Sequence, residues 1–467
     1  MPPSPAFRPA TRHGELGDAF FDVVAPARFP AHLPRHRDQR WAARIGLETL
    51  TEAEWLDHFG RFAPLPGSFA APLALRYHGH QFRAYNPDLG DGRGFLFAQA
   101  HDLRDGRLLD LGTKGSGRTP WSRGGDGKLT LKGGVREVLA TALLEALGVD
   151  TSKSLSLVET GEALARGDEP SPTRSAVLVR LSHSHIRIGS FQRLAHLGDT
   201  ASLRRLLDYA IRTYLPECWR EVEADRAPAF LAEVCRRVAR TGARWMTAGF
   251  VHGVLNTDNI NITGESFDYG PWRFLPVLDP EFTAAYFDYN GLYAYGRQPE
   301  ALHWNLVRLA ECLLPLTDID RLREVLSGFE TALRRDYAQA VTWRLGLRPG
   351  GEAADAALAA TFTAALQETQ APFEQAFFDW RGGTPRGEAA YDAAAWVPVR
   401  AALAGFEPAA EANLGHPYFA RAAPCTLLIE EVETIWAPIA EADDWSAFHA
   451  KLAEIALLAE ACGTTPA

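Results

Sequence analysis

The side chains best suited to chemistry in this sequence lie in one polar loop and just after it. The loop reads Val251-His-Gly-Val-Leu-Asn-Thr-Asp-Asn259, and Phe267-Asp-Tyr-Gly270 follows it. Asp258 is a carboxylate that can take a proton from a hydroxyl. Asn259 and Asp268 offer the oxygen ligands that Mg²⁺ and Mn²⁺ prefer. The alternative is structural, because Asn and Asp side chains commonly hold a turn by bonding to nearby backbone groups.

The spacing of residues within this loop matches the catalytic loop of protein kinases, which bind ATP. Protein kinases carry a His-Arg-Asp-x-x-x-x-Asn loop with a metal-binding asparagine, followed by an Asp-Phe-Gly segment whose aspartate also binds metal. His252 and Asn259 have the same separation, and Asp268-Tyr-Gly resembles Asp-Phe-Gly. One position differs, because Val254 replaces the catalytic aspartate and cannot accept a proton. Asp258 is the nearest carboxylate that can take over that task.

Two stretches nearer the N-terminus are candidates for binding phosphate. In Gly90-Asp-Gly-Arg-Gly94 the glycines let the backbone approach a phosphate, and Arg93 supplies charge. A plain hairpin turn is the alternative.

Lys114 follows a strand-like run, and Glu137 lies 23 residues later on an amphipathic helix. In kinases such a lysine and glutamate pair to hold ATP. The alternative is a surface lysine and a glutamate that favours the helix dipole.

Two arginines after the next apolar run could also hold phosphate. Arg180 ends the run Ala176-Val-Leu-Val, and Arg187 follows seven residues later. The guanidinium group binds phosphate oxygens in pairs, although an exposed strand end with solvated arginines gives the same pattern. His183 and His185 lie between them but have no third ligand nearby, so we do not expect a metal pair there.

Charge and composition narrow the choice of partners. The 467 residues carry a net charge of −10, whereas nucleic-acid-binding proteins normally show a basic excess, so we expect no nucleic acid partner. Only five lysines occur, and Lys114, Lys128 and Lys132 fall within one nineteen-residue window, which indicates a local anion site. The five cysteines lack metal-site spacing. Without a secretory signal or a membrane-spanning apolar run, the sequence predicts a cytoplasmic protein with no membrane partner.

The hydrophobic pattern predicts two halves of different construction. Short apolar runs between Gly-rich turns predict a small sheet, interrupted by one helix that starts after Gly133-Gly134. From about residue 200 onward, helical spacing prevails, so the fold class is α+β with two lobes. The predicted parts are an extended N-terminal arm draped over the body (1–70), a nucleotide-binding lobe (71–190), a helical lobe with the catalytic and metal-binding loop (191–385) and a C-terminal helical region (386–467).

Five motifs follow one another in a specific order. They are Tyr77-His-Gly-His-Gln-Phe, Leu89-Gly-Asp-Gly-Arg-Gly, Lys114-Gly-Ser-Gly-Arg-Thr-Pro-Trp-Ser-Arg-Gly-Gly-Asp-Gly, His183-Ser-His-Ile-Arg, and His252-Gly-Val-Leu-Asn-Thr-Asp-Asn with Asp268-Tyr-Gly-Pro. Together they resemble the selenoprotein O family, whose bacterial members are known as YdiU. The resemblance implies a protein-kinase-like fold and a pseudokinase that binds ATP in an orientation flipped relative to active kinases. It also implies transfer of AMP to Ser, Thr or Tyr hydroxyls of other proteins.

The resemblance assigns a role to each matching residue. The implied nucleotide-binding positions are Gly90, Gly92, Arg93, Lys114, Asp126, Gly127, Arg180, Arg187 and Asp268. Asn259 and Asp268 match the ligands of Mg²⁺ or Mn²⁺. Asp258 matches the proton acceptor, and Glu137 matches the helix partner of Lys114. The implied partners are ATP as co-substrate and proteins with hydroxyl side chains.

Three other interpretations stay open, and the chain departs from the family at a few positions. UMP transfer with Mn²⁺ is known within the family, and nothing in the sequence specifies the base. A pseudokinase could instead bind ATP without transferring any part of it. A phosphotransferase for small molecules would need an aspartate where Val254 stands. The family usually has glycine in place of Arg83 and arginine in place of Lys128 and Lys132.

Overall fold

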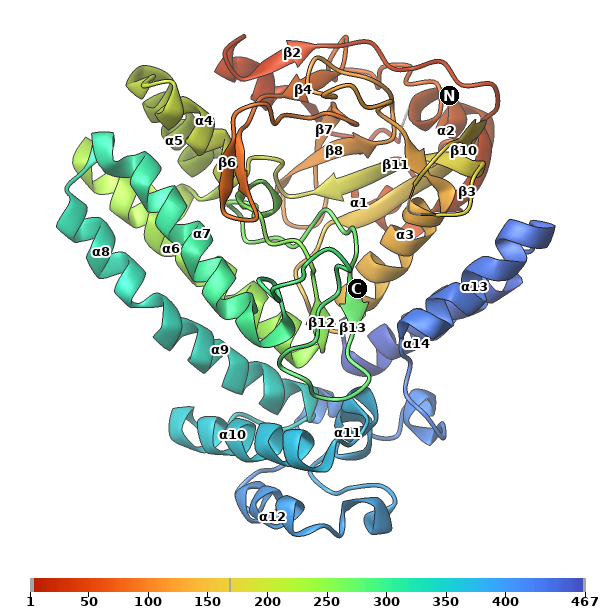
Figure 1. Cartoon of the computed structure of the whole chain (residues 1–467), viewed down its shortest axis with the longest axis vertical. Coiled ribbons are helices and arrows are strands. Elements are labelled where there is room, and N and C mark those ends of the chain that lie inside the picture. The colour runs from red at the N-terminus through yellow and green to blue at the C-terminus, as the bar shows by residue number, and fades with distance from the viewer. Residues whose placement is uncertain (1–3, 168, 465–467) are drawn as a thin grey trace.

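The computed structural model describes residues 4–167 and 169–464 and has an α+β architecture (Figure 1). The strands are β1 (Pro9–Ala10), β2 (Phe21–Val23), β3 (Leu33–Arg37), β4 (Leu73–Leu75), β5 (Gly79–Gln81), β6 (Ala84–Asn86), β7 (Leu96–His101), β8 (Leu108–Lys114), β9 (Leu129–Thr130), β10 (Lys153–Leu164), β11 (Thr173–Ser182), β12 (Phe250–Val251) and β13 (Arg273–Phe274). The α-helices are α1 (Gln39–Arg44), α2 (Glu52–Phe59), α3 (Leu131–Ala146), α4 (Ile188–His196), α5 (Thr200–Tyr214), α6 (Glu223–Thr247), α7 (Gln298–Leu313), α8 (Ile319–Ser327), α9 (Phe329–Arg344), α10 (Glu352–Thr369), α11 (Phe373–Asp379), α12 (Val397–Leu403), α13 (Ile429–Ala442) and α14 (Ser446–Cys462).

One antiparallel sheet organises the N-terminal half of the chain. Its main order is β2-β4-β7-β8-β11-β10-β3, with β1 paired to β7 and β9 paired to β11. Both faces of the sheet are buried. In β11, Val177 and Val179 belong to one hydrophobic cluster, whereas Ala176 and Leu178 belong to another. This burial on two sides explains why the strand appears in the sequence as a continuous apolar run without alternation.

Residues 4–70 add strands to the sheet and side chains to the core, so the prediction of an extended arm draped over the body was wrong for them. β1, β2 and β3 pair with the sheet, and Trp41, Trp55 and Phe59 of α1 and α2 pack with Phe97 and Val179 on one sheet face. The two helices are only six and eight residues long, too short to show a helical period. A capping box between Thr51 and Glu54 starts α2 and is the signal that was overlooked. The domain boundaries near 70, 190 and 385 stay predictions.

Truncating Trp55 tests whether this segment belongs to the core. The side chain is 1% exposed, and its Nε1 donates a hydrogen bond to Ser156 Oγ at 2.9 Å. We expect Trp55→Ala to lower the free energy of unfolding by about 3–5 kcal/mol in urea denaturation followed by circular dichroism. Val23→Ala, at a side chain that is 67% exposed, is the control and should leave it unchanged. A Trp55→Ala protein that unfolds like the wild type would mean that the segment only lies on the surface.

Helix α3 covers the other face of the sheet and starts earlier than predicted. Thr130 is its N-cap, and the Thr130 hydroxyl accepts a hydrogen bond from the backbone N–H of Gly133 at 3.1 Å. The two glycines therefore lie in the first turn instead of before it. Position 134 leaves no room for a side chain, because a Cβ there would lie 2.5 Å from Leu157 Cδ1 on β10. The close approach sets the helix firmly against the sheet.

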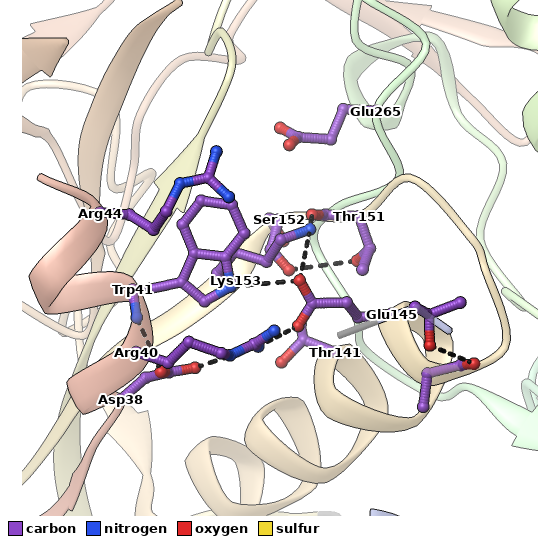
Figure 2. A network of polar contacts seen from close by, with 12 residues as sticks. Asp38, Arg40, Trp41, Arg44, Thr141, Glu145, Thr151, Ser152, Lys153 and Glu265 are labelled. Carbon is purple, nitrogen blue, oxygen red and sulfur yellow. Dashed lines mark hydrogen bonds and ion pairs between the residues drawn. The ribbon is translucent and has the colours of Figure 1, made fainter. Parts of the chain in front are cut away.

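Polar contacts fix the C-terminal end of α3 to the N-terminal segment. Figure 2 shows Arg40, Trp41 and Lys153 reaching toward the carboxylate of Glu145. Trp41 Nε1 donates a hydrogen bond to Glu145 Oε1 at 3.1 Å, Arg40 pairs with the other carboxylate oxygen, and Lys153 Nζ lies 3.6 Å from Oε1. α3 is thus held at both ends, which matters because Glu137 stands near its middle.

The C-terminal helices return to the sheet half of the molecule. In Figure 1, α13 and α14 lie beside α3 rather than beyond the helical half. Lys132 Nζ pairs with Glu433 at 2.7 Å, and Asp443 pairs with Arg174 at 2.6 Å and with Arg35 at 3.1 Å. The C-terminal region therefore braces α3.

The remaining helices form the second half of the molecule. α6 packs against α7, α8 and α9, and a separate cluster joins α9 to α12 through residues such as Phe362, Trp380 and Trp396. The chain between α6 and α7 forms β12, β13 and the polar loop between them. Among residues 4–167 and 169–464, no helix combines the length and apolar character needed to cross a membrane.

Candidate active site

A closed loop carries the two carboxylates that the sequence singled out. β12 and β13 pair at its base, with Phe250 opposite Phe274. Within the loop, His252 Nε2 lies 3.0 Å from the carbonyl oxygen of Phe267. The Nδ2 group of Asn259 donates to the carbonyl oxygen of Val254 at 3.0 Å. These bonds fix the loop, so Asp258, Asn259 and Asp268 come to line one cavity.

The cavity lies between this loop and the glycine-rich segments of the sheet half, and its volume is about 700 Å³. This volume suits a ligand of nucleotide size, since ligand pockets commonly span a few hundred to a thousand Å³. The predicted residues that line it are Gly90, Gly92, Arg93, Asp126, Gly127, Asp258, Asn259 and Asp268. Lys114, Glu137, Arg180 and Arg187 are not among the lining residues and stand behind Asp268 and Asp258.

A buried ion cluster backs the cavity at Asp268. Lys114 Nζ lies 2.6 Å from Glu137 Oε2 and 3.0 Å from Asp268 Oδ1. Arg180 NH1 lies 3.1 Å from the same Asp268 oxygen and 3.6 Å from Glu137 Oε1. The pairing of Lys114 on β8 with Glu137 on α3, which motif spacing indicated, is thus formed. Two cations share one partly accessible carboxylate, an arrangement ready to exchange that carboxylate for phosphate oxygens.

Asp268 has an unusual electrostatic environment. Burial alone would raise the pKa of Asp268, but the charges of Lys114 and Arg180 outweigh it and hold the pKa well below its usual range. The residue stays ionised at any physiological pH. Its φ angle is +62°, in the left-handed region that Asp and Asn adopt more readily than other residues with a Cβ.

Asp258 is a poorly solvated carboxylate. Burial raises the pKa of Asp258 to about 6, against the opposing charge of Arg187. Its Oδ1 is buried and has no hydrogen-bond partner among the residues that the structure describes. Because Asp258 lines the cavity and its pKa is raised, its carboxylate is suited to take a proton from a substrate hydroxyl.

Arg187 supports Asp258 from behind. Its NH1 donates to the backbone oxygen of Asp258 at 3.2 Å, and its NH2 lies 3.6 Å from Asp91 Oδ1. The guanidinium stacks on Tyr77 with 4.1 Å to the ring centroid. The backbone N–H of Ile188, which follows Arg187, donates to the carbonyl oxygen of Ile260 at 3.0 Å and continues the contact. In this structure Arg187 positions the Asp258 loop and reaches the cavity only through it.

The oxygen donors of the site fit a divalent cation that also binds phosphate. Among residues 4–167 and 169–464, no three His, Cys, Asp or Glu side chains gather into a metal site of their own. Asn259 uses its Nδ2 group on Val254 O, which leaves Oδ1 for a cation beside Asp268. Mg²⁺ typically takes one or two protein carboxylates and completes its shell with water and substrate phosphates. Asn259 and Asp268 suit that role.

Two glycine-rich loops interlock at the roof of the cavity. Thr119 Oγ1 donates to Asp91 O, and Ser122 Oγ donates to Gly92 O. Trp121 lies over the first loop, so a Cβ on Gly90 would come 2.4 Å from Trp121 Cγ and one on Gly92 would come 2.6 Å from the Trp121 carbonyl oxygen. These glycines are therefore required by packing between the loops as well as by access to the ligand.

Gly92→Ala tests this packing. A backbone oxygen cannot rotate away as a side chain can, so the loops must separate. We expect a loss of about 1–3 kcal/mol in the free energy of unfolding, measured by urea denaturation, and weaker nucleotide binding. Gly405→Ala is the control because a Cβ there would meet nothing within 4 Å. Equal stability of the two variants would show that the loops are not interlocked in solution.

Several cavity residues were not among the predicted site positions. Arg166 pairs with Asp126 at 2.8 Å and lines the cavity, but it lies forty residues away without any motif around it. Arg118, Arg123 and Lys128 also line the cavity, as the cluster of basic residues indicated. Lys132 belongs to the same cluster but pairs with Glu433 instead.

Comparisons with known proteins show the family to which the chain belongs. Residues 6–398 match the family model described as protein adenylyltransferase SelO. Proteins named protein nucleotidyltransferase YdiU are similar to the chain. The one from Gloeobacter violaceus is 46% identical over 450 residues, covering 93% of this chain and 92% of its own length. Those from Synechocystis sp. and Synechococcus elongatus are each 51% identical, covering 71% and 74% of this chain and 69% and 68% of their own lengths. The chain therefore belongs to the SelO family of protein nucleotidyltransferases, and it is an enzyme of that class.

Proposed function

We propose that this enzyme transfers AMP from ATP to Ser, Thr or Tyr hydroxyls of proteins, in a reaction that depends on Mg²⁺ or Mn²⁺. The observation that carries the proposal is the placement of Asp258. Asp258 lines the cavity together with Asp268 and has a raised pKa, while the kinase base position is Val254. A site with intact phosphate-binding and metal-binding groups but a displaced base favours a different transfer from that of a kinase.

The proposed fold is protein-kinase-like with two lobes. The ion pair from β8 to α3, the glycine-rich loops above the cavity and the Asp268-Tyr-Gly segment below it are the parts that such a fold uses to hold ATP. The sheet and α3 correspond to the smaller lobe, and α6 to α12 correspond to the larger one.

In the proposed reaction, Asp258 removes the proton of the acceptor hydroxyl. The hydroxyl oxygen attacks the α-phosphorus, a new P–O bond forms, and the bond from the α-phosphorus to the bridging oxygen breaks to release pyrophosphate. Lys114, Arg180 and Arg93 stabilise the negative charge that develops on the triphosphate. A divalent cation held by Asn259 and Asp268 would neutralise phosphate charge when bound. ATP must then lie flipped relative to kinases, with its α-phosphate near Asp258.

Label transfer tests this function. With Mg²⁺ or Mn²⁺, the label of α-labelled ATP should become covalently attached to protein, and the label of γ-labelled ATP should not. A chelator should abolish the transfer. Competition by unlabelled UTP at the same concentration tests whether the enzyme distinguishes adenine from uracil. Attachment of the γ-label would identify a phosphotransferase. Thermal stabilisation by ATP without any attached label would identify a binding-only pseudokinase.

A further inference from the structure

Exposed aromatic side chains gather beside the candidate active site. Among the described residues, Tyr289 and Tyr286 are the two most exposed large hydrophobic side chains, at 88% and 74%. Phe287 and Phe82 are also exposed, and their ring centroids lie 5.8 Å apart, while those of Tyr286 and Phe287 lie 5.1 Å apart. We call Phe82, Tyr286, Phe287 and Tyr289 the aromatic patch. Clustered exposed apolar side chains mark interaction sites, whereas isolated ones need no explanation.

Hydrogen bonds to Asp288 fix the backbone of the turn that carries three residues of the patch. The buried carboxylate of Asp288 accepts hydrogen bonds from the backbone N–H groups of Leu292 and Tyr293, each at 2.8 Å. This arrangement fixes the turn that carries Tyr286, Phe287 and Tyr289. A fixed backbone lowers the conformational entropy that the turn loses on binding, which favours it as a contact surface.

The hairpin that presents Phe82 is strained. β5 and β6 are joined by only two residues, Phe82 and Arg83, with φ angles of +49° and +64°. Asn-Gly is the usual sequence for such a turn, because bulky residues rarely adopt positive φ. A strained conformation kept with a bulky side chain next to a reactive site points to a binding role for that side chain.

The patch is joined directly to the loop that carries Asp258. The Oδ1 atom of Asn256 accepts hydrogen bonds from Phe82 N at 3.0 Å and from the Tyr293 hydroxyl at 2.9 Å. Asn256 and Gln81 line the cavity, whereas no residue of the patch does. The patch therefore lies outside the proposed ATP site, next to its entrance on the Asp258 side.

The charged residues around the patch neutralise one another. Arg83 pairs with Glu300 at 2.8 Å, and Arg297 lies 3.5 Å from Glu281. Asp288 is buried, and its carboxylate accepts hydrogen bonds from backbone groups. The surface therefore offers aromatic faces whose neighbouring exposed charges are paired, which suits apolar side chains better than acidic or basic ones.

We propose that the aromatic patch binds the protein substrate, by holding apolar side chains that flank the acceptor hydroxyl. The inference rests on the proposed function, since it assumes a protein acceptor at Asp258. An extended segment lying on the patch brings its next residues to the cavity entrance through Phe82 and Asn256. The patch acts on substrate affinity and not on the chemical step.

The test compares two peptides of equal length with a central Ser-Tyr pair, one flanked by Leu and the other by Asn. The enzymes are the wild type, Tyr286→Ser/Tyr289→Ser and, as a control, Val222→Ser, whose side chain is 61% exposed at the start of α6. Transfer of α-label from ATP gives kcat and KM for each peptide. Thermal stabilisation by ATP and Mg²⁺ checks that the variants are folded and bind nucleotide.

The wild type and Val222→Ser should favour the Leu peptide by about tenfold in kcat/KM, and the double variant should lose this preference through KM. The inference is overturned if the double variant keeps the preference, or if the wild type labels both peptides equally. It is also overturned if sedimentation shows that the patch only joins two copies of this chain, with a wild-type dimer that the double variant dissociates. Failure of the proposed function is a separate outcome, in which the wild type transfers no α-label to any peptide or protein.

Discussion

Replacing Asp258 with asparagine is expected to slow AMP transfer by about 10²- to 10⁴-fold, the range that a positioned general base contributes. The amide keeps the shape of the side chain but cannot accept a proton from the acceptor hydroxyl. ATP binding should persist, because Lys114, Arg180 and Asp268 still form the ion cluster. The measurement is the initial rate of α-label transfer at saturating ATP, together with thermal stabilisation by ATP and Mg²⁺.

The pH profile provides the control for this variant. Since burial raises the pKa of Asp258 to about 6, the wild-type rate should fall as the pH drops below that value, where the base becomes protonated. The residual rate of Asp258→Asn should not change between pH 5 and 7. A variant with the wild-type rate, or with the same inflection near pH 6, would assign the base to another residue.

The same substitution should stabilise the fold at neutral pH. Because the pKa of Asp258 is higher in the folded than in the unfolded chain, ionising it above about pH 6 disfavours folding. A pKa shift of about two units corresponds to at most about 3 kcal/mol in the free energy of unfolding. Asp258→Asn should regain this amount of stability at pH 8. Below about pH 4 the carboxyl is protonated in both states, so the difference should vanish. Urea denaturation at the two pH values measures it.

Lys114→Met is expected to lower the free energy of unfolding by about 3–5 kcal/mol and to abolish ATP binding. Lys114 is buried, and the side chain of Glu137 is completely buried. Removing the lysine leaves that carboxylate with Arg180 at 3.6 Å as its nearest cation. Breaking a buried pair from one side is costly because the remaining charge is uncompensated. Urea denaturation and thermal stabilisation by ATP measure the two effects.

A double variant separates stability from function at this pair. Replacing both Lys114 and Glu137 with methionine removes both buried charges, so much of the lost stability should return. ATP binding should not return, because the phosphate-binding cation is still missing. If Lys114→Met and the double variant are equally unstable, uncompensated charge is not the cause of the loss.

The sequence predicted the α+β class, and it also indicated which side chains lie together. The spacing from His252 to Asn259 and the Asp268-Tyr-Gly segment predicted that Asp258, Asn259 and Asp268 act together; the three residues line one cavity, and their roles stay predictions. The Lys114–Glu137 pair was predicted from its spacing on a strand and a helix. Short motifs of this kind succeed because the geometry they impose is local.

Long-range packing was the part that could not be predicted. The N-terminal segment looked irregular because its strands and helices are very short, and they are stable only through contacts such as Trp55 with Ser156. The return of α13 and α14 to α3 depends on pairs such as Lys132 with Glu433, which are 301 residues apart. Arg166 was missed as a cavity residue for the same reason.

The most direct test of the central claim is the mass of the product. After incubation of the enzyme with ATP, Mg²⁺ or Mn²⁺ and a hydroxyl-bearing protein, intact mass spectrometry should find acceptor molecules heavier by one AMP, with one pyrophosphate released for each. Asp258→Asn should yield almost none. An acceptor heavier by a single phosphate, with ADP as the second product, would contradict the account and show that the site works as a kinase.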